Sequence, residues 1–422
     1  MNIMNKRRTF CKISFFSIAV ALFLISSTAL ITAAESVSPA ITETRITTSA
    51  LACNADIYGD KIAFLDDRNG NPDIYMYDLS TSRETQITTS GSAHQPVIYG
   101  NRIVWMDQRN GNADIYMYDL SSSRETQITT NASDQMNPAI YGDRIVWEDF
   151  RNGNYYDIYM YDLSTSEEKK IDAIGLDPAI YGDRIVWYDG RNGNADIYMY
   201  DLSTSEETQI TTDTSYQQFP SIYGNRIVWE DWRNENPDVY MYDLSTSREE
   251  RITTNASVYD PAIYGDKIVW TDDRDEEYDN DIYMYDLSTN TETKITTSKL
   301  AFYPAIYDNK IVWHDWRNGG RDIYMATVSE EGLEPVLPVA DFSASPSTGE
   351  APLAVTFIDK STGSPSSWSW NFGDRSISTA QNPVHTYNKV GKYTVSLTVG
   401  NAAGNDNKKV SKCIIVKKNF KK

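Results

Sequence analysis

Two series of aspartates recur along the chain beside a series of arginines, and such a set could bind metal or perform acid–base chemistry. One series lies two residues before an arginine, as Asp149 lies before Arg151, and the other precedes a short apolar run, as Asp157 does. The series are Asp66, Asp107, Asp149, Asp189, Asp231, Asp272 and Asp315, then Asp73, Asp114, Asp157, Asp196, Asp238, Asp281 and Asp322. A catalytic site is normally singular, whereas this set is repeated, so we expect arginine forks that pair carboxylates across a hairpin and serve as scaffold.

Two histidines and one acidic turn are the other candidates for metal chemistry. His94 and His314 are expected on one face of the protein, but a metal site would require more imidazoles than two. A lengthened acidic turn could offer oxygens to Ca²⁺, although its spacing is not that of an EF-hand and acidic runs are commonly solvated. The candidate ligands are Asp272, Asp273, Asp275, Glu277 and Asp279. We predict no other cofactor and find no GxSxG, HExxH or phosphate-binding glycine loop, and therefore no catalytic constellation.

A repeat of about 42 residues must position these side chains. Its clearest marker is a tyrosine that follows an isoleucine, at Tyr58, Tyr99, Tyr141, Tyr181, Tyr223, Tyr264 and Tyr307. One copy divides into short strands at Pro138–Tyr141, Arg144–Asp149, Asp157–Leu163 and Glu168–Asp172, separated by turns such as Gly142-Asp143. Four short strands in each repeat predict the blades of a β-propeller, in which both faces of each blade are dry.

The ends of the array predict seven blades. The last copy stops after its third strand, at Asp322–Met325, while an unpaired fourth strand, within residues 43–48, precedes the first copy. We expect that N-terminal strand to complete the seventh blade, because this closure leaves no bare sheet edge. The repeat, IYGDRIVWxDxRNGNxDIYMYDLSTxxETQIT, resembles the TolB-like, WD40-like propeller repeat from about Glu43 to Ser329. That resemblance implies the fold and leaves the function open among adaptors, adhesins and occasional enzymes.

Blade positions that vary predict a binding surface better than those that repeat. Variable residues flank the constant Asp or lie just ahead of the first strands, and all belong to connections that emerge on one face of the ring. We predict a ligand-binding face there, against the alternative of drift in exposed loops. The candidate binding residues are His94, Phe150, Tyr188, Phe219, Trp232, Tyr303, His314 and Trp316.

Beyond the repeats the pattern changes to that of a second all-β domain. Val355–Ile358 and Tyr393–Val399 alternate as half-buried strands do. The motif Trp370-Asn371-Phe372-Gly373-Asp374, followed by Pro383, His385, Tyr387 and Gly391–Val395, resembles a PKD domain, an immunoglobulin-like sandwich. The resemblance implies an extracellular spacer or contact module, with His385 packed as a structural residue.

The resulting domain plan is that of an exported protein. Residues 1–34 have a basic start, an apolar middle and small residues at Thr32–Ala34, which predict a signal peptide, with an uncleaved anchor as the alternative. Residues 35–330 form the propeller, 331–337 a linker, 338–418 the PKD domain and 419–422 a basic tail. The sequence leaves open whether Cys53 and Cys413 pair. Glycosylation sequons occur at Asn131 and Asn255.

Charge and motifs together favour a binding protein at the cell surface. The formal net charge of −20 disfavours nucleic acid and anionic lipid as partners. We therefore expect a non-enzymatic, secreted or cell-surface protein that holds a partner protein or a glycan, and that reaches a membrane only through an uncleaved signal. Tandem propeller and PKD units also resemble archaeal surface-layer-associated proteins. The alternatives are an extracellular polysaccharide lyase or hydrolase, with His94 and His314 as metal ligands, and a structural component of the envelope.

Overall fold

The computed structural model describes residues 39–418 except 154, 173, 255–256, 275–278, 330–336, 364 and 402. The predicted signal peptide, most of the predicted linker and the basic tail lie outside the described residues. All regular elements in the described part of the chain are strands, and no helix there is long and apolar enough to cross a membrane.

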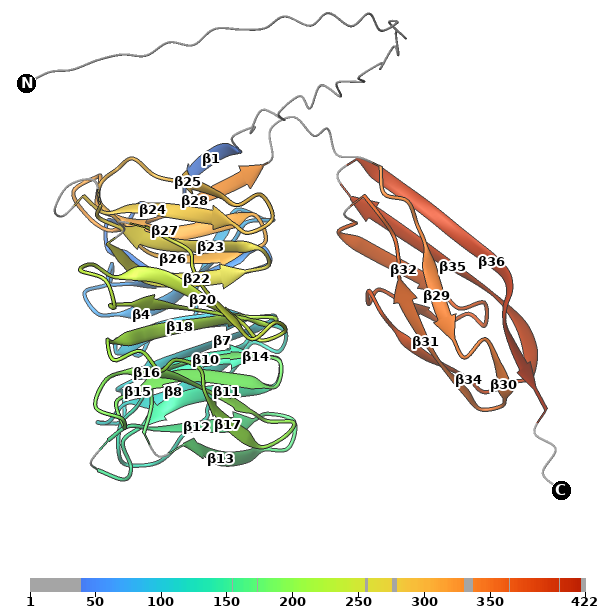
Figure 1. Cartoon of the computed structure of the whole chain (residues 1–422), viewed down its shortest axis with the longest axis horizontal. Helices are drawn as coiled ribbons and strands as arrows, with labels where there is room; N and C mark the ends of the chain where they lie inside the picture. The colour runs from blue at the N-terminus through green and yellow to red at the C-terminus, as the bar shows by residue number, and fades with distance from the viewer. Residues whose placement is uncertain are drawn as a thin grey trace, which may run out of the picture. The chain divides into compact units, whose positions relative to one another are not determined.

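The repeats form seven four-stranded antiparallel sheets, counted over the described residues, and Figure 1 shows them coloured in chain order from blue to orange. The innermost strands are β2 (Ala52–Tyr58), β6 (Ala93–Tyr99), β10 (Gln135–Tyr141), β14 (Leu176–Tyr181), β18 (Gln217–Tyr223), β22 (Val258–Tyr264) and β26 (Ala301–Tyr307). The second strands are β3 (Lys61–Asp66), β7 (Arg102–Asp107), β11 (Arg144–Asp149), β15 (Arg184–Asp189), β19 (Arg226–Asp231), β23 (Lys267–Asp272) and β27 (Lys310–Asp315). The third strands are β4 (Asp73–Asp78), β8 (Asp114–Asp119), β12 (Asp157–Asp162), β16 (Asp196–Asp201), β20 (Asp238–Asp243), β24 (Asp281–Asp286) and β28 (Asp322–Ser329). The fourth strands are β5 (Arg83–Gln86), β9 (Arg124–Gln127), β13 (Glu167–Asp172), β17 (Glu206–Gln209), β21 (Arg248–Arg251), β25 (Thr291–Lys294) and, from the N-terminal end, β1 (Ala40–Arg45).

The N-terminal strand β1 occupies the outer position of the last blade. It pairs antiparallel with β28, with Glu43 opposite Ala326 and Arg45 opposite Tyr324. The pairing partner is the expected one, although the strand covers Ala40–Arg45 rather than residues 43–48. Arg317 of this blade forms an ion pair with Glu43, 2.5 Å apart, in the way that Arg151 pairs with Glu168 on β13. The N-terminal strand thus supplies the same partners as a fourth strand within its own repeat.

The marker tyrosines close the ring at one end of the innermost strands. Each ring contacts the next at centroid distances of 4.6–4.9 Å, and the series returns from Tyr307 to Tyr58 at 4.7 Å. Alternate residues of β10 differ in exposure, since Pro138 and Ile140 are buried whereas Asn137, Ala139 and Tyr141 are half-buried. Asn137, Ala139 and Tyr141 therefore line the central channel that a propeller encloses.

A fully buried aromatic residue on the second strand is the centre of each blade contact. These residues are Phe64, Trp105, Trp147, Trp187, Trp229, Trp270 and Trp313. Trp147, for example, packs with Val104 and Ile115 of the preceding blade and with Tyr159 of its own. Both faces of each blade are dry, as expected. Burial of each of these aromatic side chains stabilises the folded protein by about 2–3 kcal/mol.

The innermost strands are longer than predicted because each contains a bulge. The register between β10 and β11 shifts between Met136 and Ala139, and Asn137 has a φ of 49°. We predicted this position to lie just ahead of the strand, but it lies inside it. The left-handed residues at this position are Asn54, Gln95, Asn137, Asp177, Phe219, Asp260 and Tyr303. A bulge redirects its side chain, and here it places one variable residue of each blade at the channel.

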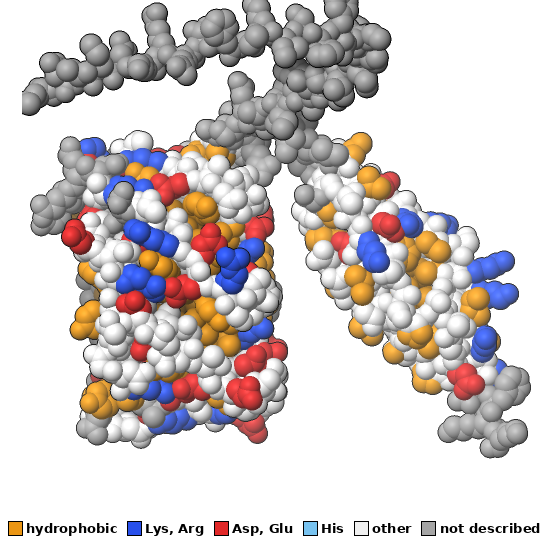
Figure 2. All heavy atoms as spheres, in the orientation of Figure 1, with side chains coloured by type: hydrophobic (Ala, Val, Ile, Leu, Met, Phe, Trp, Pro, Cys, Tyr) orange, Lys and Arg blue, Asp and Glu red, His pale blue; other side chains and the backbone are white. Residues whose placement is uncertain are grey.

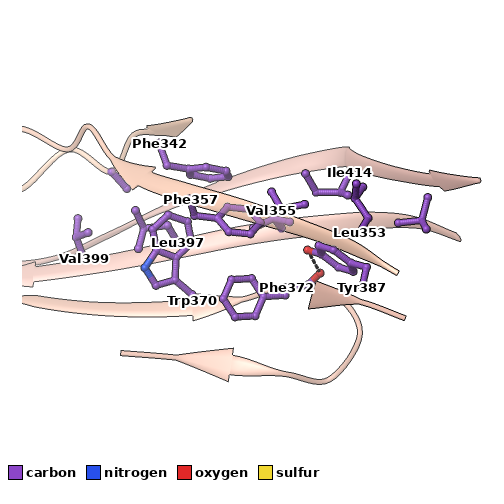
Figure 3. Close-up of a cluster of buried hydrophobic side chains, with 13 residues drawn as sticks. Phe342, Leu353, Val355, Phe357, Trp370, Phe372, Tyr387, Leu397, Val399 and Ile414 are labelled. Carbon is purple, nitrogen blue, oxygen red and sulfur yellow. Dashed lines mark hydrogen bonds between the residues drawn. The ribbon is translucent and has the colours of Figure 1, made fainter. Parts of the chain in front are cut away.

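The C-terminal unit is a two-sheet sandwich. One sheet contains β29 (Phe342–Ser345), β31 (Leu353–Asp359) and β34 (Val384–Tyr387). The other contains β30 (Thr348–Glu350), β36 (Gly404–Lys417), β35 (Gly391–Asn401), β32 (Ser367–Asn371) and β33 (Ile377–Ser378). Figure 3 shows the core between them, where Trp370, Phe357, Leu397 and Tyr387 are fully buried. His385 stacks on Phe372 at 4.3 Å and contacts Asp374 at 2.8 Å, so it is packed.

Candidate functional site

The two ends of the propeller differ in what they expose. Each innermost strand starts, and each second strand ends, on the face opposite the tyrosine ring, which we call the channel face. In the described part of the propeller, every exposed large hydrophobic side chain lies there, in a bulge, in a turn between second and third strands, or in a connection between blades. These side chains are Leu51, Tyr155, Tyr216, Phe219, Trp232, Leu300, Tyr303 and Trp316.

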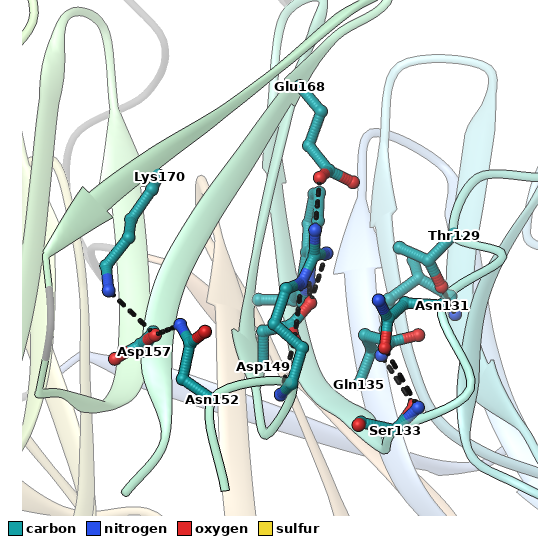
Figure 4. A network of polar contacts seen from close by, with 12 residues as sticks. Thr129, Asn131, Ser133, Gln135, Asp149, Asn152, Asp157, Glu168 and Lys170 are labelled. Atoms are coloured by element: carbon teal, nitrogen blue, oxygen red, sulfur yellow. Dashed lines mark hydrogen bonds and ion pairs between the residues drawn. The ribbon is translucent and has the colours of Figure 1, made fainter.

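The first aspartate series is scaffold, as expected from its repetition. Asp149 is fully buried, and it accepts hydrogen bonds from Arg151 Nη2 at 2.5 Å and from Trp147 Nε1 at 3.0 Å. The same guanidinium donates to Glu168 at 2.6 Å and lies 4.1 Å above the ring of Tyr159. Figure 4 shows Asp149 and Glu168 joined through these bonds. Each blade contains this arginine–aspartate pair.

The electrostatics of Asp107, the member of this series in the second blade, agree with that role. Burial alone would raise the pKa of Asp107, but hydrogen bonds from Arg109, Ser92 and Trp105 outweigh it and lower the pKa to about 2. A carboxylate held ionised in this way is a poor proton donor or acceptor near neutral pH.

The second aspartate series is held mainly by threonine, and among the described residues arginine pairs only with Asp238 and Asp322, so our expectation of arginine for the whole set holds for these two members alone. Thr129 Oγ1 donates to Asp114 at 3.4 Å and accepts from the backbone N–H of Ile115 at 2.8 Å. Equivalent threonines serve Asp73, Asp196, Asp238, Asp281 and Asp322. In the third blade Asp157 instead contacts Lys170 at 2.8 Å and Asn152, as Figure 4 shows.

The variable residues meet at the bulge end of the channel, which we call the channel mouth. Asn137 donates to Glu148 at 2.8 Å and to Asp177 of the next blade at 3.1 Å. The backbone N–H of Asp177 donates to Glu148 Oε1 at 2.7 Å, and that of Asp260 to Glu230 Oε1 at 2.7 Å. The N–H of Tyr303 donates to Thr271 Oγ1 at 3.2 Å in the same way. A second-strand side chain thus accepts the bulge N–H of the following blade.

Four carboxyl groups at the mouth, Glu148, Asp177, Glu230 and Asp260, have raised pKa values, and we call them the mouth carboxylates. Burial is the largest cause for each, and the pKa values are about 7, 6, 8 and 7 in that order. The charge of Asp177 adds to the rise at both Glu230 and Asp260, so the four lie in one electrostatic group. Such groups titrate near neutral pH, where ordinary carboxyls are fully ionised.

The mouth carboxylates belong to the variable positions of the predicted binding face, but our candidate binding residues did not include them. The available signal was the position itself, since Glu148 and Glu230 stand where other blades have Leu65, Met106 or Thr271. The bulge that brings Asp177 and Asp260 to the channel is formed by residues other than glycine, and no turn motif marks it.

Several predicted aromatic residues lie beside the mouth carboxylates. Tyr188 contacts Phe219 at a centroid distance of 5.8 Å, and Tyr303 contacts His314 at 5.4 Å. Burial raises the pKa of Tyr188, and the charge of Asp177 adds to this rise. Trp232 and Trp316 are 39% and 45% exposed on the same face. Phe150 is half-buried against Tyr156 at 5.0 Å.

The described residues show no group of three or more His, Cys, Asp or Glu arranged to hold a metal ion. His314 is buried and His94 half-buried, and they belong to different blades. Burial lowers the pKa of His314 to about 4, so its imidazole is neutral at physiological pH. In the acidic turn, Asp272 pairs with Arg274 and Asp279 with Lys299, while Asp273 is half-buried. Asp275 and Glu277 lie outside the described residues.

The other candidate groups are two cysteines, two sequons and two hollows. Cys53 and Cys413 are free thiols, and burial raises the pKa of Cys53 to about 11. Asn131 is exposed and accepts the N–H of Ser133 at 3.0 Å, whereas Asn255 lies outside the described residues. Two shallow hollows, of about 340 and 260 Å³, lie on the tyrosine face between repeated turns such as Gly224-Asn225. We assign them to the scaffold because the same turns recur in most blades.

Comparisons with known proteins agree with this architecture. Residues 334–416 match the family model of the PKD domain, so the C-terminal unit is a PKD domain. Collagenase ColA of Bacillus cereus is 45% identical over 49 residues, which are 12% of this chain and 5% of the collagenase. The chain therefore spans only a small part of that enzyme.

Solved propellers resemble the first unit in fold. An oligogalacturonate lyase from Vibrio parahaemolyticus has a TM-score of 0.56 at 13% identity over 70% of this chain and 99% of its own. The β-propeller domain of the Trilobed protease from Pyrococcus furiosus has a TM-score of 0.55 at 16% identity over 68% and 95% of the two chains. Another similar structure is an oligogalacturonate lyase in complex with manganese, with a TM-score of 0.55 at 13% identity over 70% and 97% of the two chains. These identities show a shared propeller fold alone.

Proposed function

We propose that this chain is a non-enzymatic, extracellular or cell-surface binding protein that holds a partner protein or a glycan on the channel face. The observation that carries the proposal is the segregation of exposed large hydrophobic side chains to that face. Surfaces that bind partners are enriched in exposed aromatic residues. On the rest of a protein surface, exposed hydrophobic side chains are normally scattered singly. A propeller joined to a PKD domain also fits an extracellular binding module.

The rest of the molecule suits a rigid support for such a surface. The turns of the tyrosine face repeat with little change, and the blades are fixed by buried tryptophans and arginine–aspartate pairs. Acidic and basic side chains are interspersed on the visible side of both units in Figure 2, which is typical of a solvated surface. In this proposal the PKD domain acts as a spacer or second contact.

An extracellular lyase or hydrolase is the second candidate function. Glu148 and Glu230 favour it, since a carboxyl with a pKa of about 7 or 8 can serve as a general acid near neutral pH. Each of these carboxyls accepts a backbone N–H of the next blade, which favours a structural role instead. Release of products from polysaccharides, with and without added Mn²⁺, would favour the enzyme.

The test of the binding proposal is saturable binding of the fluorescently labelled full chain to purified cell envelopes of the source organism. We expect the double variant Trp232→Ala/Trp316→Ala to lose most of this binding while its unfolding transition is unchanged. The matched control is Ile377→Ala/Val384→Ala, which removes two exposed hydrophobic side chains from the PKD domain. Equal binding of the tryptophan variant and the wild type would remove the channel face as the binding surface.

A further inference from the structure

The mouth carboxylates have no cationic partner in the described structure. No lysine or arginine among the described residues forms an ion pair with Glu148, Asp177, Glu230 or Asp260, and their hydrogen bonds come from amide N–H groups and uncharged side chains. Every aspartate of the first series, in contrast, has its arginine. Buried carboxylates are normally paired, so a group of four without a cation can accept one from a ligand.

His314 supplies a second observation at the same place. It is 6% exposed, and its buried Nδ1 has no hydrogen-bond partner. It stands at the blade position of Glu148, Glu230 and Thr271, whose side chains all reach the bulge of the next blade. His314 also stacks on Tyr303, whose pKa is raised first of all by the charge of Asp260 and then by burial. An unpartnered, neutral imidazole thus lies against Tyr303 at the channel mouth and can accept a hydrogen bond.

Aromatic side chains surround the carboxylates on the solvent side. Trp232 lies beside Glu230 and Tyr188 beside Asp177, since each aromatic side chain lowers the pKa of the neighbouring acid against the effect of burial. Phe219 and Tyr303 lie in the bulges themselves, 37% and 51% exposed. Rings beside a group of carboxylates favour a cation with an apolar stem, since the stem packs on the rings and the charge can lie over them.

We infer that the channel mouth receives a basic peptide segment, with a lysine or arginine side chain inserted among Glu148, Asp177, Glu230 and Asp260 and within reach of His314. The inference rests on the proposed function, because it takes the channel face as the binding surface, and it names the chemistry of the partner. Two observations support the inference. The charge of the mouth carboxylates is complementary to a basic side chain, and the aromatic side chains around them are of the kind enriched in protein interfaces.

Binding of such a segment must depend on pH. The titratable and charged groups at the mouth are the four carboxyls, Tyr188, Tyr303 and His314, together with Cys53 and Arg321, which act on Tyr303 and His314. Asp56 lies two residues beyond the bulge on β2, and burial raises its pKa to about 6. In the pH range from 5 to 8.5 the carboxyls are the groups that change charge. A cation favours their ionised forms, so its binding releases protons. Affinity is therefore expected to rise with pH over this range.

The experiment measures binding of fluorescein-labelled hexalysine to the full chain by anisotropy at pH 5 and pH 8.5. We expect one hexalysine per chain, tighter binding at pH 8.5, and weakening by about tenfold in Asp177→Asn/Asp260→Asn. The matched control is Asp143→Asn/Asp183→Asn, which removes the same charge from exposed turns of the opposite face and should leave affinity unchanged. This control also distinguishes binding of hexalysine at the mouth from its general electrostatic attraction to an acidic protein.

Four outcomes would overturn the inference. Equal weakening of hexalysine binding in both double variants would mean that net charge causes the effect. No weakening in either variant would mean that the mouth carboxylates do not bind the peptide. Saturable binding of a glucosamine hexamer that requires Asp177 and Asp260, without binding of hexalysine, would assign the mouth to an amino glycan. Saturable binding of Mn²⁺ alone at the mouth would assign it to a metal. In each case loss of envelope binding by the Trp232→Ala/Trp316→Ala variant would still support the proposed function.

Discussion

The backbone N–H of Asp260 donates a 2.7 Å hydrogen bond to the carboxyl of Glu230 in the preceding blade. The same bond joins Asp177 to Glu148 two blades earlier. Each bond links a bulge residue to a second-strand residue of another repeat, so the contacts that hold adjacent blades together also fix the carboxyl groups at the channel mouth. Stability and the proposed binding are therefore coupled at this end of the propeller, and the first prediction follows from that coupling.

The glutamine variant Glu230→Gln should stabilise the propeller at pH 8.5 and change little at pH 5. Burial raises the pKa of Glu230 in the folded protein to about 8, above its unfolded value, so folding binds a proton between these pH values. Stability from this group is thus present below pH 4–5 and is lost as pH rises towards 8. A gain on the order of 1–3 kcal/mol would appear as several degrees in Tm. Thermal unfolding at both pH values checks this, and an equal effect at both would contradict the assignment.

Removing Ala40–Thr47 should leave the last blade with an unpaired edge at β28 and produce an aggregating or poorly folded protein. The deleted segment contains the whole of β1 and the Thr47 hydroxyl that bonds Asp322 at 3.2 Å. An exposed edge strand is a template for association with other chains. Size-exclusion chromatography and thermal unfolding are the measurements. The control Glu43→Gln removes only an exposed ion pair and should cost at most about 1 kcal/mol. A soluble monomeric deletion product with unchanged Tm would show that β1 does not close the ring.

Replacing Asp149 by asparagine should destabilise the propeller by about 3 kcal/mol. The variant removes a fully buried charge and leaves the Arg151 guanidinium and the Trp147 Nε1–H with a weaker partner. Glu168→Gln, which changes the exposed end of the same network, is the control and should cost about 1 kcal/mol or less. Urea unfolding of both variants measures the difference. Equal costs would mean that the buried pair is no more important than the exposed one.

In the PKD domain, Tyr387→Phe should cost about 1–2 kcal/mol. Its hydroxyl donates to the carbonyl of Phe372 at 3.0 Å inside the core, and the variant leaves that carbonyl unsatisfied. Tyr393→Phe is matched in chemistry, but its hydroxyl bonds an exposed carbonyl, that of Lys389, and water can replace it. We therefore expect only a few tenths of a kcal/mol there. The unfolding transition of the PKD domain in the full chain reports both, and reversal of their order would contradict this account.

Much of the fold could be predicted because the same local strand and turn patterns occur seven times in the sequence. The predicted strand Arg144–Asp149 is β11 without change, and the predicted strands at Asp157–Leu163 and Glu168–Asp172 differ from β12 and β13 by one residue each. Alternation and turn motifs act over a few residues, so a sequence records them directly. The predicted first strand, Pro138–Tyr141, was too short because the left-handed residue at Asn137 carries no glycine signal.

The sequence by itself determined the repeat, the scaffold role of the first aspartate series and the face on which the blades differ. Only the tertiary structure decided which of the differing residues act together. Asp177 and Asp260 are two repeats apart in the chain, yet the charge of one raises the pKa of the other. The physical reason is that burial and Coulomb interactions depend on distance through space, and that distance exists only once the bulges and the closed ring have turned these side chains towards one channel.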